Sequence, residues 1–197
     1  MSNVNLGTIF ERASKWNSVR YPRVYNHELS VNLLDEELNE YFEAESSVDQ
    51  LDALCDLVFV SMGILWKTGI DIRLLDSTSD WSNTQATALL KANVFEPIHL
   101  VASVLIKYKY VNEEYPTALA VQTIITLCMV QMSGMGLNTE ESLAALLIVC
   151  NSNDSKSIKK TEPHIKANGG DKGKDFVTPE PALLDLLIKM EKRHNGN

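Results

Sequence analysis

The sequence predicts an all-α protein, a helical bundle built around an antiparallel pair of helices that carry carboxylates. Three observations favour this fold class: apolar residues recur at helical spacing between residues 33 and 69, two long apolar segments follow at about 96–111 and 117–133, and an amphipathic segment covers about 180–193. A chain of 197 residues with a hydrophobic fraction of 45% can bury a core of its own. We therefore expect one domain over residues 1–197.

The first helix of the pair carries three glutamates beside its apolar face. At roughly 100° per residue, Leu34, Leu38 and Tyr41 share one face. Glu37 and Glu40 flank that face, and Glu36 points further out. We expect this helix to end at a turn near Ser46 and Ser47.

The second helix carries aspartates beside a longer apolar face, which is formed by Leu51, Leu54, Cys55, Val58, Met62 and Leu65. Asp52 and Asp56 are four residues apart and lie together at its edge. Packing the two helices antiparallel brings four or five carboxylates to one boundary between core and solvent. Because like charges repel and resist desolvation, we expect a cation there. Oxygen ligands favour Mg²⁺, or Mn²⁺, over zinc.

These residues also carry a family resemblance. The segment EELNE (Glu36 to Glu40), followed by DALCD (Asp52 to Asp56) and LVFVSMGILWKTGID, resembles the all-α NTP pyrophosphohydrolase superfamily. That superfamily includes MazG, phosphoribosyl-ATP pyrophosphohydrolase and the dimeric dUTPases, with EExxE on one helix and ExxD on the next. The chain departs from this signature at Ala53, which stands in the place of a glutamate, while an acid stands at Asp52. Which of Asp52 and Asp56 ligates directly stays open.

The resemblance implies a Mg²⁺-dependent hydrolase that converts a nucleoside triphosphate to the monophosphate and pyrophosphate. Glu37, Glu40, Asp52 and Asp56 are the expected metal ligands, and Mn²⁺ can replace Mg²⁺. Glu36 is the first candidate for the carboxylate that accepts the proton of the attacking water. Glu37 is the second candidate catalytic residue. The implied substrate is a deoxynucleotide, for which dUTP is one candidate.

A late segment is basic and glycine-rich in an otherwise acidic chain. Residues 152–178 read as a flexible loop that starts with Ser152, Asn153, Ser155 and Lys156 and ends with KGKDFVTP. By composition alone this is a solvated surface loop. The same two motifs, however, are similar to those of phage and bacterial MazG-like proteins. Asn153, Lys156, Lys172 and Lys174 are therefore candidates for phosphate binding.

The connector NSVRYPRVYN, residues 17–26, precedes the acidic helix and contains Pro22, which blocks a helix. It can be an ordinary polar connector with packed tyrosines. The resemblance places this region beside the nucleotide, which makes Asn17, Arg20 and Arg23 candidates for contacts with the base or phosphates.

Helix boundaries follow from capping residues. We expect a first helix at about 4–16, Asn26 or Ser30 as the cap of the acidic helix, and a capping box of Ser47 with Gln50. Gly69 is the expected C-cap of the second acidic helix. A short helix is expected at about 83–91. Another helix is capped by Asn138 or Thr139, with Glu141 completing a capping box from Asn138, and covers residues 143–150.

Charge and composition exclude several partners. A net charge of −8 argues against general nucleic-acid or anionic-membrane binding, although a metal ion can still bring phosphate to the site. Cys55, Cys128 and Cys150 lie on apolar helix faces and read as buried free thiols. We see no signal peptide and no membrane span, and we expect a soluble cytoplasmic protein. Superfamily relatives imply a homodimer or homotetramer.

Two other functions stay open. The Ala53 departure leaves room for a non-catalytic helical oligomer or nucleotide-binding regulatory module with a degenerate metal site. Glu96 and His99 form one ExxH motif, which is typical of di-iron bundles, but those sites need two such motifs. We expect His99 to be a partly buried helix histidine.

Overall fold

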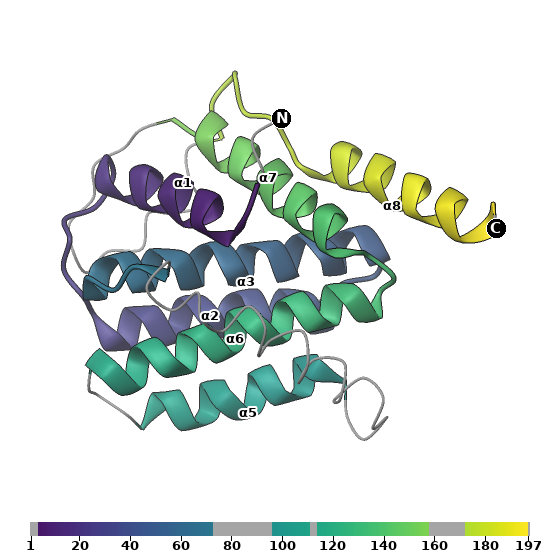
Figure 1. The fold of residues 1–197 in the computed structure, drawn as a ribbon. Helices are drawn as coiled ribbons and strands as arrows, with labels where there is room; N and C mark the ends of the chain where they lie inside the picture. The colour runs from purple at the N-terminus through teal and green to yellow at the C-terminus, as the bar shows by residue number, and fades with distance from the viewer. Residues whose placement is uncertain (1–3, 73–95, 111–113, 158–171, 197) are drawn as a thin grey trace.

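The computed structural model describes residues 4–72, 96–110, 114–157 and 172–196. These residues form seven α-helices and no strand (Figure 1). The helices are α1 (Leu6–Ser18), α2 (His27–Glu43), α3 (Ser47–Thr68), α5 (Pro97–Lys109), α6 (Glu114–Gly134), α7 (Thr139–Ser155) and α8 (Glu180–Asn195). The predicted fold class, an all-α bundle, is confirmed. The short helix expected at about 83–91 lies outside the described residues.

Helix α3 is the centre of the bundle. It packs against α1, α2, α6, α7 and α8, and Figure 1 shows it between the α2 side and the α7 side of the molecule. All six predicted apolar positions on α3 are buried, and so are Ala53, Leu57, Phe59, Ser61 and Ile64 outside that stripe. Between Leu51 and Leu65, only Asp52, Asp56 and Val60 are not fully buried, so the packing of α3 fixes the position of both aspartates along its edge.

The predicted antiparallel pair is α2 and α3, which lie side by side in Figure 1 and are joined by residues 44–46. Asn26 caps α2 by accepting a hydrogen bond from the Leu29 N–H at 2.9 Å, as one of the two expected caps. The Ser47–Gln50 capping box was wrong. Ser46 is the N-cap of α3, and its hydroxyl both accepts from the Asp49 N–H and donates to the Asp49 carboxylate, at 2.7 Å.

The C-terminal end of α3 matches the prediction. Gly69 has a φ of +85°, in the left-handed region that glycine enters without a Cβ penalty. Its N–H returns to the carbonyls of the last turn of α3. The chain can therefore leave α3 sharply at this residue.

Helix α1 crosses α3 at a glycine. A Cβ added to Gly63 lies 2.9 Å from the Asn17 Nδ2 atom, closer than side chains tolerate. Asn17 is buried there and donates from Nδ2 to the Ala13 carbonyl oxygen at 2.8 Å. The close approach of the two helices places the last turn of α1 against the C-terminal half of α3.

Helices α5 and α6 correspond to the two long apolar segments: they pack on each other, α6 packs on α3, and α5 packs on α2. Residues Thr117–Gly134 of α6 are apolar enough to cross a membrane, with a mean hydropathy of 1.4, but 56% of that stretch is buried inside the molecule. Leu119 is an exception on this apolar helix, because its side chain is 59% exposed. It lies on the side of α6 that no described helix covers.

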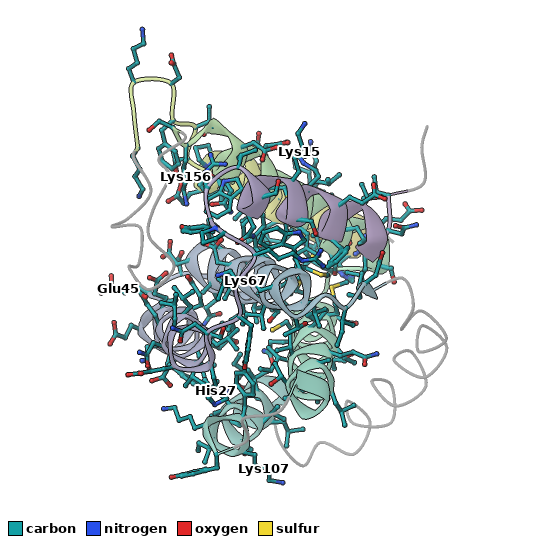
Figure 2. All side chains as sticks on the ribbon, turned by 90° about the vertical axis from the view of Figure 1, so that its left-hand side faces the viewer. Lys15, His27, Glu45, Lys67, Lys107 and Lys156 are labelled. Atoms are coloured by element: carbon teal, nitrogen blue, oxygen red, sulfur yellow. The ribbon has the colours of Figure 1, made fainter. Side chains whose placement is uncertain are left out.

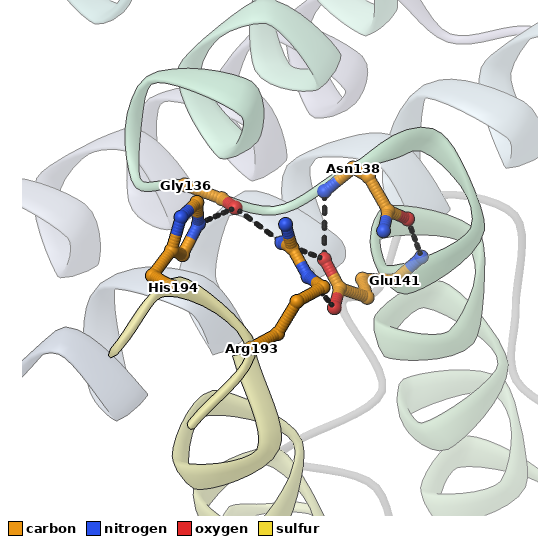
Figure 3. A network of polar contacts seen from close by, with 5 residues as sticks. All are labelled: Gly136, Asn138, Glu141, Arg193 and His194. Atoms are coloured by element: carbon orange, nitrogen blue, oxygen red, sulfur yellow. Dashed lines mark hydrogen bonds and ion pairs between the residues drawn. The ribbon is translucent and has the colours of Figure 1, made fainter. Parts of the chain in front are cut away.

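The last helix, α8, packs on α3 and α7 and is fastened at its C-terminal end (Figures 1 and 3). Arg193 donates to both Glu141 carboxylate oxygens at 3.0 and 2.8 Å and to the Gly136 carbonyl oxygen at 3.0 Å. His194 Nε2 lies 3.0 Å from the same carbonyl oxygen. Glu141 also completes the predicted capping box with Asn138. One glutamate thus caps α7 and holds α8.

The expected start of the basic loop was wrong. Helix α7 continues to Ser155, so Ser152 and Asn153 belong to a helical turn, and both are buried. Serine and asparagine are weak helix formers. Contacts from α1 and the bond from the Ser155 hydroxyl to the Ser152 carbonyl oxygen, at 2.7 Å, hold this turn in helical form. The part of the loop at 158–171 lies outside the described residues.

Candidate functional site

The candidate site lies where the edge of α3 meets α2, the end of α7 and the start of α8. Asp52 and Asp56 project from α3, and both interact electrostatically with Glu40 of α2. Both aspartates are only partly exposed to solvent, whereas Glu40 is exposed. Three of the four predicted metal ligands therefore influence one another through their charges.

The surroundings of Asp52 disfavour its negatively charged form. Burial is the largest cause that raises the pKa of Asp52, to about 7, and the negative charges of Asp56, Glu180 and Glu40 raise it further. Lys156 opposes this shift but does not cancel it. Asp52 Oδ1 is also buried and has no hydrogen-bond partner among the described residues. A carboxylate oxygen in this position favours either a proton or a cation.

Asp56 is joined to the basic end of α7. Burial raises the pKa of Asp56, while Lys156 and a hydrogen bond from the Asn153 side chain lower it. Lys156 Nζ donates in turn to Asn153 Oδ1 at 2.7 Å. Asn153 is buried, so a chain of polar contacts runs from the ammonium group through the amide to the carboxylate. Figure 2 shows Lys156, the C-cap of α7, above Lys67 of α3, with His27 and Lys107 below them.

The remaining glutamates occupy the same helix as Glu40. Glu36 and Glu37 are partly exposed, between the buried positions Leu34 and Leu38. Glu37 precedes Glu40 by three residues and therefore lies on the same side of α2. The proton-accepting role of Glu36 and the metal-binding role of Glu37 stay predictions.

The residues present fit a hard divalent cation. Carboxylate oxygens are the donors that Mg²⁺ prefers, and one of them is buried without a partner. Within the described ranges, no three Asp, Glu, His or Cys side chains already form a metal-binding group. The carboxylates are thus gathered around one edge of α3 without being arranged as a finished coordination shell.

The end of α7 is held from α1. Trp16 Nε1 donates to the Asn153 carbonyl oxygen at 2.7 Å, and Arg20 Nη2 donates to the Lys156 carbonyl oxygen at 2.8 Å. The Arg20 guanidinium lies over the Trp16 ring, 4.4 Å from its centroid. Arg20 is 7% exposed, and burial lowers its pKa from the ordinary value. The guanidinium binds main chain here rather than facing open solvent.

The other two connector candidates also bind main chain. Asn17 is buried against Gly63 and donates within α1. Arg23 Nε donates to the Trp66 carbonyl oxygen at 2.8 Å, near the C-terminal end of α3. Nucleotide contacts by Asn17, Arg20 and Arg23 stay predictions, because nothing in the described structure tests them.

The two later lysines differ in position. Lys172 is close enough to Asp56 to lower the pKa of that carboxyl group, and its Nζ atom lies 5.1 Å from the centroid of the Phe176 ring. Lys174 is exposed in the turn that follows. The chain after this turn is tied to α7, because the Val177 N–H donates to the Ser155 hydroxyl at 2.8 Å.

Sequence reasoning missed two residues of the site. Glu180, in the first turn of α8, raises the pKa of Asp52. An acid at the start of a predicted helix, directly after the KGKDFVTP motif, was the available signal. Trp16 was read only as the end of the first helix, and no sequence pattern joins it to Asn153, which lies 137 residues later.

The ExxH motif lies elsewhere on the surface. His99 is exposed, not partly buried as expected, and its ring is stacked on Phe42 with centroids 5.6 Å apart. Glu96 is the exposed N-cap of α5. Neither residue lies among the groups that perturb Asp52 or Asp56.

The sequence was also compared with known proteins and protein families. No curated protein and no solved structure was found to match the chain. The model of the phosphoribosyl-ATP pyrophosphohydrolase family matches residues 7–76. This match indicates a pyrophosphohydrolase that acts on a nucleotide-like substrate. The predicted resemblance to the all-α NTP pyrophosphohydrolase superfamily is thus confirmed over a segment that contains Glu36, Glu37, Glu40, Asp52 and Asp56.

Proposed function

We propose that this protein is a Mg²⁺-dependent nucleoside triphosphate pyrophosphohydrolase, which converts a (deoxy)nucleoside triphosphate, with dUTP as one candidate, to the monophosphate and pyrophosphate. The observation that carries the proposal is the electrostatics of α3. Asp52 holds a buried, unpartnered carboxylate oxygen beside Asp56 and Glu40. The charge of Lys156 acts on both aspartates, and the Asn153 side chain donates a hydrogen bond to Asp56. Such a site is short of positive charge until a divalent cation binds.

Glu37, Glu40, Asp52 and Asp56 would hold Mg²⁺, with Mn²⁺ as a substitute. The bound cation supplies Lewis-acid stabilisation of negative charge on the phosphate oxygens. Because the described carboxylates do not yet form a coordination shell, we expect the exposed Glu40 side chain to close toward α3 when the cation binds.

The protein's own residues would act on both sides of the scissile bond. Glu36 accepts the proton of the water that attacks the α-phosphorus. Lys156, Lys172 and Lys174 bind the departing pyrophosphate and stabilise its charge, and Asn153 orients Lys156 through the observed hydrogen bond. Burial around Asp52 and Asp56 strengthens these charge interactions.

Surface composition supports the proposal of a homodimer or homotetramer. Ile106 of α5 and Leu119 of α6 are 58% and 59% exposed, although both are large and apolar. Helices α5 and α6 pack together. We assign these two side chains to the surface that another subunit covers.

Isosteric substitutions test the site. Glu40→Gln and Asp56→Asn should each lower kcat/KM by about 100-fold or more, because each removes a charge that holds the cation. Glu43→Gln is the matched control, on an exposed acid three residues beyond Glu40 on the same helix. Calorimetry with Mg²⁺ alone should show weaker binding for the first two variants and unchanged binding for the control. Full turnover in Glu40→Gln and Asp56→Asn would rule out this metal site.

A further inference from the structure

The end of α7 carries two groups of the proposed site, and it is anchored by α1 and the residues that follow α1. Asn153 and Lys156 face Asp56 only if the last turn of α7 keeps its helical path. That turn has the sequence NSNDS, whose residues have low helix propensity. The carbonyl groups at a helix end also lack partners within the helix. An outside anchor is therefore needed here.

The anchor is a pair of side chains from α1 and the residues that follow it. Trp16 and Arg20 donate to the carbonyl oxygens of Asn153 and Lys156, at 2.7 and 2.8 Å. These are the main-chain groups of the two residues whose side chains reach Asp56. Arg20 also donates to the Trp16 carbonyl oxygen at 3.2 Å.

The donors are themselves rigidly placed. The Trp16 ring meets Phe59 of α3 edge-on, with centroids 5.5 Å apart, and Phe59 follows Asp56 by three residues. The Arg20 guanidinium is stacked on the Trp16 ring and is almost fully buried. The same tryptophan thus rests on the helix that carries the carboxylates and bonds to the helix that carries the amide and the ammonium group.

We propose that Trp16 and Arg20 are positioning residues, which clamp the main chain at Asn153 and Lys156 so that both side chains face the carboxylates of α3. The inference rests on the proposed function, because it assigns Asn153 and Lys156 to phosphate binding. Arg20 acts through Lys156 and does not itself contact a phosphate. This role differs from the direct nucleotide contact that the sequence implies for Arg20.

Trp16→Phe tests the clamp, because it keeps an aromatic ring that can face Phe59 and removes the N–H donor together with one ring of the indole. The KM for the triphosphate should rise about five-fold, the value of one buried hydrogen bond, while kcat changes by less than about two-fold. The dissociation constant of an α,β-imido nucleoside triphosphate, measured by calorimetry with Mg²⁺ present, should rise by the same factor. An unchanged KM and dissociation constant would overturn the clamp.

Arg12→Gln is the matched control. Arg12 also joins α1 to the last turn of α7, but through the side chains of Asn151, at 2.8 Å, and Asp154. It leaves both carbonyl bonds intact, so its KM should stay within about two-fold of the wild type. An equal rise of KM in this control would show that the loss of any α1–α7 contact weakens substrate binding. That result would contradict a specific role for the two carbonyl bonds.

A double-mutant cycle separates positioning from direct contact. If Arg20 acts through Lys156, the Arg20→Ala, Lys156→Ala double variant should bind no more weakly than Lys156→Ala alone. If instead the two single substitutions weaken binding by factors that multiply in the double variant, Arg20 contacts a phosphate itself, and its positioning role is overturned. If Arg20→Ala does not fold, Trp16→Phe decides alone.

The activity of the wild type separates the two proposals. A wild type that releases no pyrophosphate would overturn the proposed function and the clamp with it. An active wild type whose KM is unaffected by these substitutions would overturn only the clamp.

Discussion

Asp52 is the residue that most clearly departs from ordinary packing. A buried carboxylate oxygen without a hydrogen-bond partner costs stability, and folded proteins rarely keep one. Its neighbours Asp56, Glu40 and Glu180 add repulsion. The arrangement is understandable if the native site is completed by a cation, because the same oxygen then gains a strong partner.

The raised pKa values of Asp52 and Asp56 predict an unusual pH dependence of stability in Mg²⁺-free buffer. The folded pKa of Asp52, about 7, lies above its ordinary value of 3.8, so between about pH 4 and 7 the folded state binds more protons than the unfolded state. The free energy of unfolding should therefore fall as pH rises through this window. Thermal melts in chelator at pH 5 and 7.5 measure this.

Two comparisons sharpen that prediction. Asp52→Asn should flatten the pH dependence, since the titrating group is gone. Added Mg²⁺ should raise the melting temperature more at pH 7.5 than at pH 5, because protons compete with the cation. A stability that rises from pH 5 to 7.5 without metal in the wild type, and equally in Asp52→Asn, would contradict the assignment.

Gly63 predicts a second effect at the scale of single residues. Gly63→Ala improves helix propensity but places a methyl group 2.9 Å from Asn17 Nδ2 in a buried contact. We expect a net loss of about 1–3 kcal/mol in the free energy of unfolding, measured by urea denaturation. In an Asn17→Ala background the same substitution should be neutral or stabilising. Equal effects in both backgrounds would show that the crowding is unimportant.

Among the helices, α8 connects the site to a distant anchor. Its first turn carries Glu180, beside Asp52, and its last turn carries Arg193 and His194, which bind the α6–α7 turn. Between the two ends, Leu183, Leu187 and Met190 are buried. The helix is therefore fixed by contacts at both ends and by one apolar face.

Loss of the C-terminal anchor should destabilise α8 modestly. Arg193→Ala removes bonds to Glu141 and Gly136, and for a partly exposed pair we expect a cost of about 1 kcal/mol. Limited proteolysis should then cleave more rapidly within residues 172–196. Lys192→Ala, on an exposed neighbouring lysine, is the control. Identical cleavage rates in the two variants would show that the anchor does not hold the helix.

At the scale of the whole molecule, local rules predicted the helices and tertiary contacts decided the exceptions. Asn26, Gly69 and the Asn138–Glu141 box were predictable because caps depend on a few adjacent residues. Leu119 is exposed although it lies in an apolar segment, because periodicity alone does not say which face of a helix meets a neighbour. The helical turn at Ser152 and Asn153 was missed because α1, far away in sequence, stabilises it.

The same distinction applies to the site. Glu40, Asp52 and Asp56 could be grouped from the sequence, because two apolar-faced helices joined by a short turn pack antiparallel. Asn153 and Lys156 were added by motif similarity, and the structure places them beside Asp56. Trp16 was beyond prediction and Glu180 had only a weak sequence signal, because their places depend on how α1 and α8 pack against α3.

Subunit association is a further prediction for the whole molecule. If the exposed apolar side chains of α5 and α6 meet another subunit, Leu119→Glu should shift the protein toward monomer, because it buries a charge in the interface. Analytical ultracentrifugation of wild type and variant measures this. Lys107→Glu, a charge change on the polar side of α5, is the control. A wild type that sediments as a monomer would contradict the oligomer proposal.

The most direct test of the central claim is a product analysis of the purified protein with Mg²⁺ and a panel of common nucleoside and deoxynucleoside triphosphates. Chromatography separates monophosphate from diphosphate products. The account predicts monophosphate and pyrophosphate in equal amounts, from one or a few bases, and loss of both in Asp56→Asn. Diphosphate with inorganic phosphate, or no turnover with Mg²⁺ or Mn²⁺, would contradict it.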